Sequence, residues 1–223
     1  MRTFDHIIEM AVEKHGGEDN LEKLMAQYEP PSIPLEMIPD DRYLSQMARG
    51  IFQSGFSWKV IESKWDGFEA AFDGFNPHIV SFYSDEDLDR LVSDTRIVRN
   101  GRKIQATIHN AKFVVDIAGE HGSFGAFLSK WHPDDQVGLL EVFKKRGKHL
   151  SGNTGSYFLR FMGWDSFILS GDVVTALIRE GVVDKAPTSK SAMQAVQEAF
   201  NEWCEDSGLA QRDVSKLLAF SVG

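Results

Sequence analysis

The sequence predicts an all-α fold for its 223 residues. Apolar side chains recur three and four residues apart along most of the chain, a spacing that places them on one face of a helix. No stretch alternates apolar and polar residues for long enough to predict a strand. Glycines and capping residues divide the chain, so we expect about eleven short helices in a single domain, residues 1–223, built of two packed lobes.

In the first half of the chain, glycines, prolines and capping residues separate the expected helices. Thr3 can cap a first helix that Gly16 and Gly17 end. Ser84 stands three residues before Asp87, which is close to a capping box. A linker-like loop is expected over residues 30–39, because it is rich in proline. The helices expected here cover residues 4–15, 20–28, 40–54, 58–64, 67–72, 77–83 and 84–93.

The second half begins with the longest expected helix, residues 102–119, which has an apolar face. Near the end of the chain, Thr188 or Ser189 can cap a helix that Gly208 ends. The helices expected around these segments cover residues 123–131, 134–146, 157–162, 173–180, 189–206 and 211–220.

Residues 144–172 carry the pattern that says most about function. A basic run, residues 144–149, leads into a turn built on Gly152, Thr154 and Gly155. Small residues let backbone N–H groups approach an anion closely, because no Cβ stands in the way. The start of the next helix adds a positive dipole end. The pattern therefore predicts a hairpin between two helices, at about residues 139–163, that binds a polyanion.

The distribution of charge supports a polyanionic partner although the net charge is −9. Residues 95–161 hold eleven Lys and Arg against five Asp and Glu, a local balance of +6, and the rest of the chain carries −15. Charge segregated in this way gives one basic face that steers a polyanion to one place. A chance clustering of solvated lysines would give the same numbers.

Two stretches resemble known families. The hairpin, with Asp172 twenty residues after Gly152, resembles the helix-hairpin-helix superfamily of base-excision DNA glycosylases. Upstream, residues 52–58 (FQSGFSW) and 97–106 (IVRNGRKIQA) resemble 3-methyladenine DNA glycosylase I. Together the similar stretches cover residues 40–180. The resemblance implies an enzyme that rotates a damaged nucleotide out of the duplex into an aromatic pocket.

The resemblance also implies roles for individual residues. Asp172 would be the catalytic carboxylate, which stabilises positive charge on the sugar and orients or deprotonates a water. An apolar setting between Trp164 and Phe167 would raise the pKa of Asp172. The expected base pocket consists of Trp58, Phe56, Gln53 and Trp164. The expected DNA-binding residues are Gly152, Thr154, Gly155, Ser156, Lys145, Arg146, Lys148, Arg102 and Lys103.

Several of these residues have simpler interpretations. Asp172 could serve only as a helix cap, since it follows Ser170 and Gly171 and precedes an apolar helix. Trp58 could be an ordinary core aromatic residue. Gln53 could fill the gap left by a flipped base, or it could be a solvated side chain. Sequence alone leaves these alternatives open.

The chain departs from the family pattern in three places. The family binds zinc with cysteines and histidines near both termini, whereas the one cysteine here is Cys204, so we expect no metal site and no cofactor. Gly50 stands where the family has a pocket glutamate, eight residues before Trp58. Typical family members also lack a catalytic carboxylate where this chain has Asp172, which favours the Asp-dependent branch of the superfamily as the model for the mechanism. Bifunctional glycosylases of the superfamily carry a lysine in the hairpin as an amine nucleophile. No lysine lies in the hairpin turn here, so we expect hydrolysis without strand cleavage.

The sequence thus predicts a monofunctional DNA glycosylase that acts on alkylated purines such as 3-methyladenine. Its expected partner is double-stranded DNA with damaged bases, and a cytoplasmic monomer without a membrane segment is expected. The main alternative is a non-catalytic helix-hairpin-helix module that binds DNA, which Gly50 favours and Asp172 disfavours. An all-α protein without a DNA role would require the hairpin and basic stretch to be coincidental.

Overall fold

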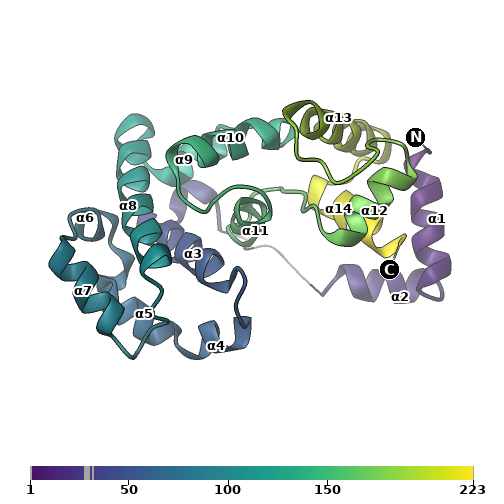
Figure 1. Ribbon diagram of the computed structural model, residues 1–223. Coiled ribbons are helices and arrows are strands. Elements are labelled where there is room, and N and C mark those ends of the chain that lie inside the picture. The colour runs from purple at the N-terminus through teal and green to yellow at the C-terminus, as the bar shows by residue number, and fades with distance from the viewer. Residues whose placement is uncertain (1, 28–30, 32, 223) are drawn as a thin grey trace. The chain divides into compact units, whose positions relative to one another are not determined.

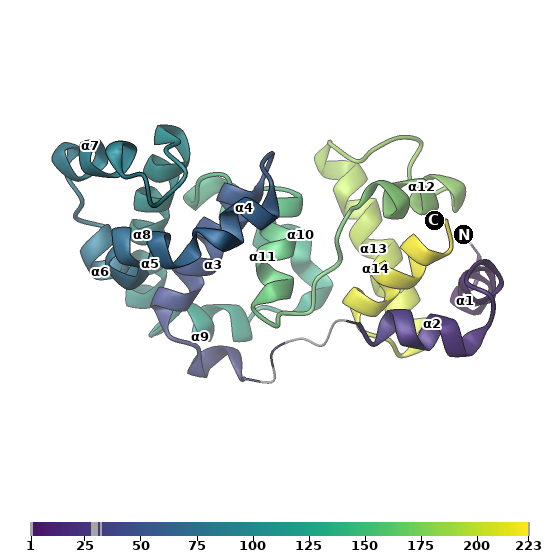
Figure 2. The same ribbon diagram turned by 90° about the horizontal axis from the view of Figure 1, so that it is seen from below.

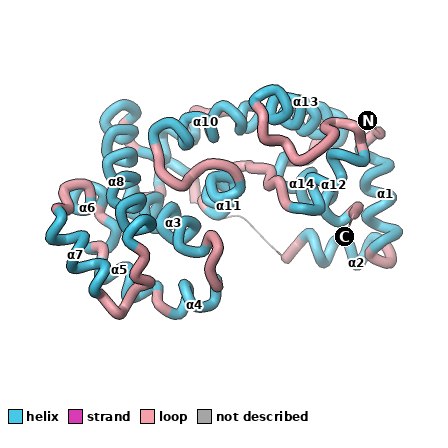
Figure 3. The backbone as a smooth tube through the Cα atoms, in the orientation of Figure 1, coloured by secondary structure: helices cyan, strands magenta, loops and turns pink. Residues whose placement is uncertain are grey.

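The computed structural model describes residues 2–27, 31 and 33–222, and these residues form helices and loops without any strand (Figures 1 and 3). The all-α prediction is confirmed. The described residues contain fourteen α-helices and three 3-10 helices. The expected total of about eleven was too low, whereas the helical segments expected one by one numbered fourteen. The chain bends sharply at Asp73, Gly74 and Phe75, all with positive φ, between the helices expected over residues 67–72 and 77–83.

Contacts within the chain divide it into two compact units. We call residues 32–131 and 139–164 the central unit, and residues 1–31, 132–138 and 165–223 the terminal unit. The expected linker over residues 30–39 lies partly outside the described residues. No helix in the described part of the chain is both long and apolar enough to cross a membrane.

The central unit is built around α3 (Asp40–Gln53), which packs against α8 (Gly101–His121) and α11 (Asn153–Phe161) (Figure 1). Fully buried aromatic rings fill the space between these helices, and Phe124 meets Phe158 edge to face with ring centroids 6.2 Å apart. The remaining α-helices of this unit are α4 (Trp58–Ser63), α5 (Trp65–Ala71), α6 (Pro77–Val80), α7 (Asp85–Ser93), α9 (Phe124–Ser129) and most of α10 (Gln136–Arg146). Two 3-10 helices, η1 (Leu35–Met37) and η2 (Asp73–Phe75), also belong to it.

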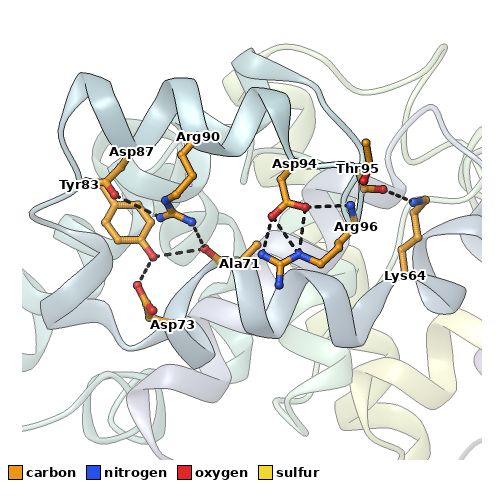
Figure 4. Close-up of polar contacts among 9 residues, drawn as sticks. All are labelled: Lys64, Ala71, Asp73, Tyr83, Asp87, Arg90, Asp94, Thr95 and Arg96. Atoms are coloured by element: carbon orange, nitrogen blue, oxygen red, sulfur yellow. Dashed lines mark hydrogen bonds and ion pairs between the residues drawn. The ribbon is translucent and has the colours of Figure 1, made fainter.

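Polar contacts fasten α7 to the end of α5 (Figure 4). The expected capping box is present, because Ser84 accepts a hydrogen bond from the Asp87 N–H while Asp87 accepts one from the Ser84 N–H. Arg90 donates to the Ala71 carbonyl and to Asp87, and the Tyr83 hydroxyl donates to Asp73 at 2.5 Å (Figure 4). These bonds hold the bend at Asp73 in place.

The terminal unit contains α1 (Phe4–Lys14), α2 (Glu18–Met25), η3 (Pro133–Asp135), α12 (Gly171–Arg179), α13 (Lys190–Ser207) and α14 (Gln211–Phe220). Within it, α14 packs against α1, α12 and α13 (Figure 2). Its core includes Phe167 and Phe200, which stack with ring centroids 4.3 Å apart. Ser189 caps α13 and Gly208 ends it in a left-handed conformation, as predicted. Thr3 precedes α1 but makes no side-chain capping hydrogen bond.

Candidate nucleic-acid interface

The predicted hairpin connects α10, which ends at Arg146, to α11, which begins at Asn153. Two side chains of α8 hold its first half. The Asn110 amide donates to the Lys148 carbonyl and accepts from the Lys148 N–H, and His109 Nε2 lies 2.9 Å from the Arg146 carbonyl. Helix α8 therefore fixes the hairpin backbone from within the central unit.

Glycines shape the second half of the hairpin. Gly152 has φ of 59°, a conformation that other residues rarely adopt. A Cβ on Gly155 would lie 2.3 Å from the Leu150 carbonyl oxygen, so only glycine lets α11 approach the hairpin this closely. Thr154 and Gly155 belong to the first turn of α11 and not to the turn before it, which corrects the sequence-based placement. Ser156 is buried at 3% exposure, and its contact with DNA stays a prediction.

The expected DNA-binding cations divide into two groups. Lys145, Lys148 and Arg102 are exposed, and their side chains form no hydrogen bond or ion pair with another described residue. Arg146 instead forms two hydrogen bonds with Glu120, at 2.8 and 2.7 Å. The Lys103 ammonium donates to the carbonyl groups of Phe52 and Ser54, and burial lowers its pKa. These partners would compete with phosphates for Arg146 and Lys103, whose contacts with DNA stay predictions.

A cavity of about 190 Å³ opens between α3, the loop that follows it and α11. Aromatic rings and uncharged polar groups line it, and none of its described lining residues is charged. These residues are Gln46, Gly50, Gln53, Ser54, Gly55, Trp58, Asn153, Thr154, Tyr157, Phe158 and Phe161. An aromatic cavity with a few polar groups is typical of a site for a small, flat ligand.

Trp58 lies at the wall of this cavity and remains 48% exposed, so the core interpretation of Trp58 was wrong. Its ring contacts Tyr157 and Phe161 edge to face, at centroid distances of 6.0 and 6.4 Å. Phe56 is exposed but does not line the cavity. Trp164 is 4% exposed and donates its indole N–H to the Leu128 carbonyl, so it belongs to the core and not to the pocket.

Gln53 lines the cavity but is only 6% exposed, and its side-chain Nε2 donates to Glu62 at 2.9 Å. The interpretation of Gln53 as a solvated side chain is therefore wrong, while its insertion into the base stack stays a prediction. Gly50 lies across from Thr154, whose Cγ2 is 3.7 Å from where a Cβ on Gly50 would be. The absence of a side chain at residue 50 leaves the cavity open at the point where the family has a carboxylate.

Asp172 lies in the terminal unit, at the second residue of α12, and it is exposed. The expected apolar setting is wrong, because Trp164 and Phe167 are buried in hydrophobic cores and Asp172 remains solvated. The cap of α12 is Ser170, whose hydroxyl accepts from the Val173 N–H, so the capping interpretation of Asp172 is wrong as well. Its catalytic role stays a prediction.

Sequence reasoning missed Tyr157 and Phe161 as pocket residues, because residues four apart on a helix are ordinarily assigned to a core. A signal was present nonetheless. Residues 157, 158, 161 and 162 are all aromatic or apolar, which is too wide a stripe for one buried face. Tyr157, Phe158 and Phe161 line the cavity, and Phe158 and Met162 are otherwise buried in the core. Gln46 and Asn153 were missed too, and no sequence signal marks them.

The family zinc site does not fit this chain. In the described residues, no group of three or more His, Cys, Asp and Glu side chains is arranged to hold a metal ion. Burial raises the pKa of the Cys204 thiol to about 12, which disfavours the thiolate that a metal would need.

Comparison with known proteins decides the family. A sequence model described as methyladenine glycosylase matches residues 35–154, more than half of the 223 residues. The chain belongs to the methyladenine glycosylase family. The DNA-3-methyladenine glycosylase 1 of Escherichia coli K12 is 42% identical over 60 residues, which are 27% of this chain and 32% of that protein. The chain thus spans about a third of that relative in the match.

Solved structures show the same fold. The 3-methyladenine DNA glycosylase I of Staphylococcus aureus matches with a TM-score of 0.53 and 22% identity, over 72% of this chain and 95% of that one. The 8-oxoguanine glycosylase/lyase of Methanocaldococcus jannaschii, solved with a 15mer DNA, matches with a TM-score of 0.55 and 13% identity, over 96% of both chains. The fold is therefore the all-α helix-hairpin-helix glycosylase fold that the sequence predicted.

Proposed function

We propose that this protein is a monofunctional DNA glycosylase that hydrolyses the N-glycosidic bond of alkylated purines such as 3-methyladenine. One observation carries the proposal. Helix α11 begins directly after the hairpin residue Gly152, and Asn153, Thr154, Tyr157 and Phe161 of the same helix line the cavity. A phosphate bound at the hairpin would therefore lie beside a pocket suited to its own flipped base.

The chemistry of the cavity fits an alkylated base. Alkylation at a ring nitrogen gives the purine in a nucleotide a positive charge, and aromatic faces attract such a cation when water is excluded. Trp58, Tyr157 and Phe161 supply these rings. The same charge makes the base a good leaving group, so the reaction needs little protonation from the pocket, which has no acidic side chain among its described lining residues.

In this proposal Asp172 supplies the negative charge that the sugar requires as the bond breaks, and it orients or deprotonates the attacking water. Because Asp172 is exposed, DNA would have to exclude water around it for a negative charge there to act strongly. Hydrolysis by water leaves an abasic site in an intact strand. Reduction with borohydride should therefore trap no covalent adduct between protein and DNA.

The test is base release from methylated genomic DNA, identified by chromatography, for the wild type, Trp58→Ala and Asp172→Asn. The proposal expects release of 3-methyladenine that falls at least about tenfold in both variants. If the Asp172→Asn variant releases 3-methyladenine at the wild-type rate, the proposed glycosylase activity stands but Asp172 has no part in its mechanism. No release from the wild type, with DNA still bound, would refute the enzyme.

That last outcome is the prediction of the second candidate, a non-catalytic DNA-binding module. The absence of a charged residue among the described lining of the cavity favours it, since the family carries a glutamate where this chain has Gly50.

As to partners, we propose that the protein binds double-stranded DNA as a monomer in the cytoplasm. Sedimentation of the protein with and without a lesion-containing duplex would test the monomer.

A further inference from the structure

The cavity has Gly50 where its family has a glutamate. A different carboxylate, that of Glu62, lies next to Gln53, one of the residues that line the cavity. Glu62 of α4 accepts a hydrogen bond from Gln53 Nε2 at 2.9 Å. The other carboxylate oxygen of Glu62 lies 3.6 Å from Arg49 Nη1. Glu62 does not line the pocket, whereas Gln53 does. The carboxylate is therefore linked to a base bound in the pocket by a hydrogen bond through Gln53 and not by direct contact.

Arg49 connects the Glu62 carboxylate to the ring of Trp65. The Arg49 guanidinium lies 4.4 Å from the centre of the Trp65 ring, a distance at which a cation is held over an aromatic face. Trp65 is itself buried at 7% exposure. Arg49 thus lies between the Trp65 ring and the Glu62 carboxylate, and it holds this carboxylate close to Gln53.

An ionised carboxylate only accepts hydrogen bonds, so the group that Gln53 turns toward Glu62 must be its NH2. The two ends of the Gln53 amide would otherwise be interchangeable, because either end can serve a polar neighbour. With Nε2 committed to Glu62, the carbonyl oxygen Oε1 is the end left for the pocket. Within the described chain Oε1 makes no other hydrogen bond, and it is not among the fully enclosed unpaired atoms.

We infer that Gln53, oriented by Glu62, presents a hydrogen-bond acceptor to the base and so selects bases that carry an amino group on the edge facing it. This inference rests on the proposed function for the identity of the ligand. It names Gln53 as a specificity-determining residue and Glu62 as a positioning residue. A base with a carbonyl oxygen in place of the amino group would bring that oxygen next to Gln53 Oε1. Two hydrogen-bond acceptors would then face each other without a proton between them, which weakens binding.

The experiment compares two free bases as probes. 3-Methyladenine carries an amino group where 3-methylhypoxanthine carries a carbonyl oxygen, and the two otherwise share shape and stacking. Their affinities are measured by titration calorimetry with the wild type, Glu62→Gln, Gln53→Met and the double variant. Glu86→Gln is the matched control, because Glu86 is exposed on α7 and its side chain forms no hydrogen bond or ion pair with another described residue.

The wild type and Glu86→Gln should prefer 3-methyladenine by about tenfold. In Glu62→Gln the Gln53 amide is free to turn over, so the preference should fall to about threefold or less. Gln53→Met should abolish the preference, and adding Glu62→Gln to it should change nothing further. A merely structural role of Glu62 would lower both affinities equally and leave their ratio unchanged, and this result would overturn the inference.

Base release from methylated DNA, measured on the same proteins, separates the two proposals. Release of 3-methyladenine with a preference that Glu62→Gln does not alter would overturn the inference and leave the enzyme. A preference that depends on Glu62 without any base release would support the inference and refute the enzyme. Binding of neither base by the wild type would overturn the inference whatever the release assay shows.

Discussion

The buried side-chain amide of Asn110 pairs with both backbone polar groups of Lys148. Asn110 Nδ2 donates to the Lys148 carbonyl at 3.0 Å, and Asn110 Oδ1 accepts from the Lys148 N–H at 2.8 Å. Asn110 has no exposed surface. The Asn110 side chain of α8 thereby takes the place of a backbone partner for the N–H and carbonyl of Lys148. It fixes the backbone of Lys148 and so the point on the surface from which the Lys148 side chain extends.

Asn110→Ala should therefore destabilise the protein by about 1–3 kcal/mol, because it leaves the two Lys148 groups without a partner. Urea denaturation of the two proteins measures the change. Gln105→Ala is the matched control on the same helix, since Gln105 is exposed and its side chain forms no hydrogen bond with another described residue. This variant should stay within about 0.5 kcal/mol of the wild type. Equal effects of the two substitutions would contradict the role of Asn110.

A second prediction concerns the glycine at the start of α11. Gly155→Ala should cost about 1–3 kcal/mol, because its Cβ would lie 2.3 Å from the Leu150 carbonyl oxygen and 2.7 Å from Leu140 Cδ2. Gly119→Ala is the matched control, since Gly119 lies in α8 with open space around its Cβ position. Alanine there should stabilise by up to about 1 kcal/mol. Thermal unfolding of the two variants should shift in opposite directions.

The sequence predicted the parts of this fold that local physics determines. The period of apolar residues predicted α8 over 102–119 and the structure has it over Gly101–His121, while the capping box at Ser84 and the end of α13 at Gly208 were both located correctly. The hairpin was located too, because glycine, a basic run and the next helix are local signals.

The roles of individual polar residues were harder to predict, because they depend on partners far away in the sequence. Arg146 meets Glu120 on another helix, and Lys103 meets carbonyl groups about fifty residues earlier. No local pattern distinguishes these cations from Lys145 and Lys148, which are exposed. Gln53 was misjudged for the same reason, since its partner Glu62 becomes a neighbour only when α3 and α4 pack together.

A third prediction follows for the exposed lysines. If Lys145 and Lys148 contact phosphates, replacing either by alanine should weaken binding to duplex DNA and reduce the slope of log K against log salt by about 0.9. Arg146→Ala should leave this slope nearly unchanged, since its guanidinium is bonded to Glu120. Lys23→Ala, at an exposed residue of α2, is the control for lost charge alone. Binding by the wild type that does not depend on salt would contradict every phosphate contact proposed.

A fourth prediction concerns stability at low pH. Burial raises the pKa of Glu69, but hydrogen bonds from Arg42, Ser45 and Trp65 outweigh it and lower the pKa below its ordinary value of 4.5. The stabilisation is therefore fully present above about pH 4.5 and is lost as the pH falls through the lowered value. In Glu69→Gln, the free energy of unfolding should be lower at neutral pH and should fall less on acidification. Parallel pH profiles of the two proteins would contradict this.

The last prediction separates the two basic neighbours at the start of α8. The Lys103 ammonium donates hydrogen bonds to the carbonyl groups of Phe52 and Ser54, in the segment that leads to Trp58, whereas Arg102 is exposed. Lys103→Met should therefore loosen this wall of the pocket and lower kcat/KM for base release by about tenfold, while the salt dependence of DNA binding stays the same. Arg102→Met should lower the salt slope and spare the pocket. The opposite pattern, a reduced slope with intact base release in Lys103→Met, would show that Lys103 contacts phosphate after all.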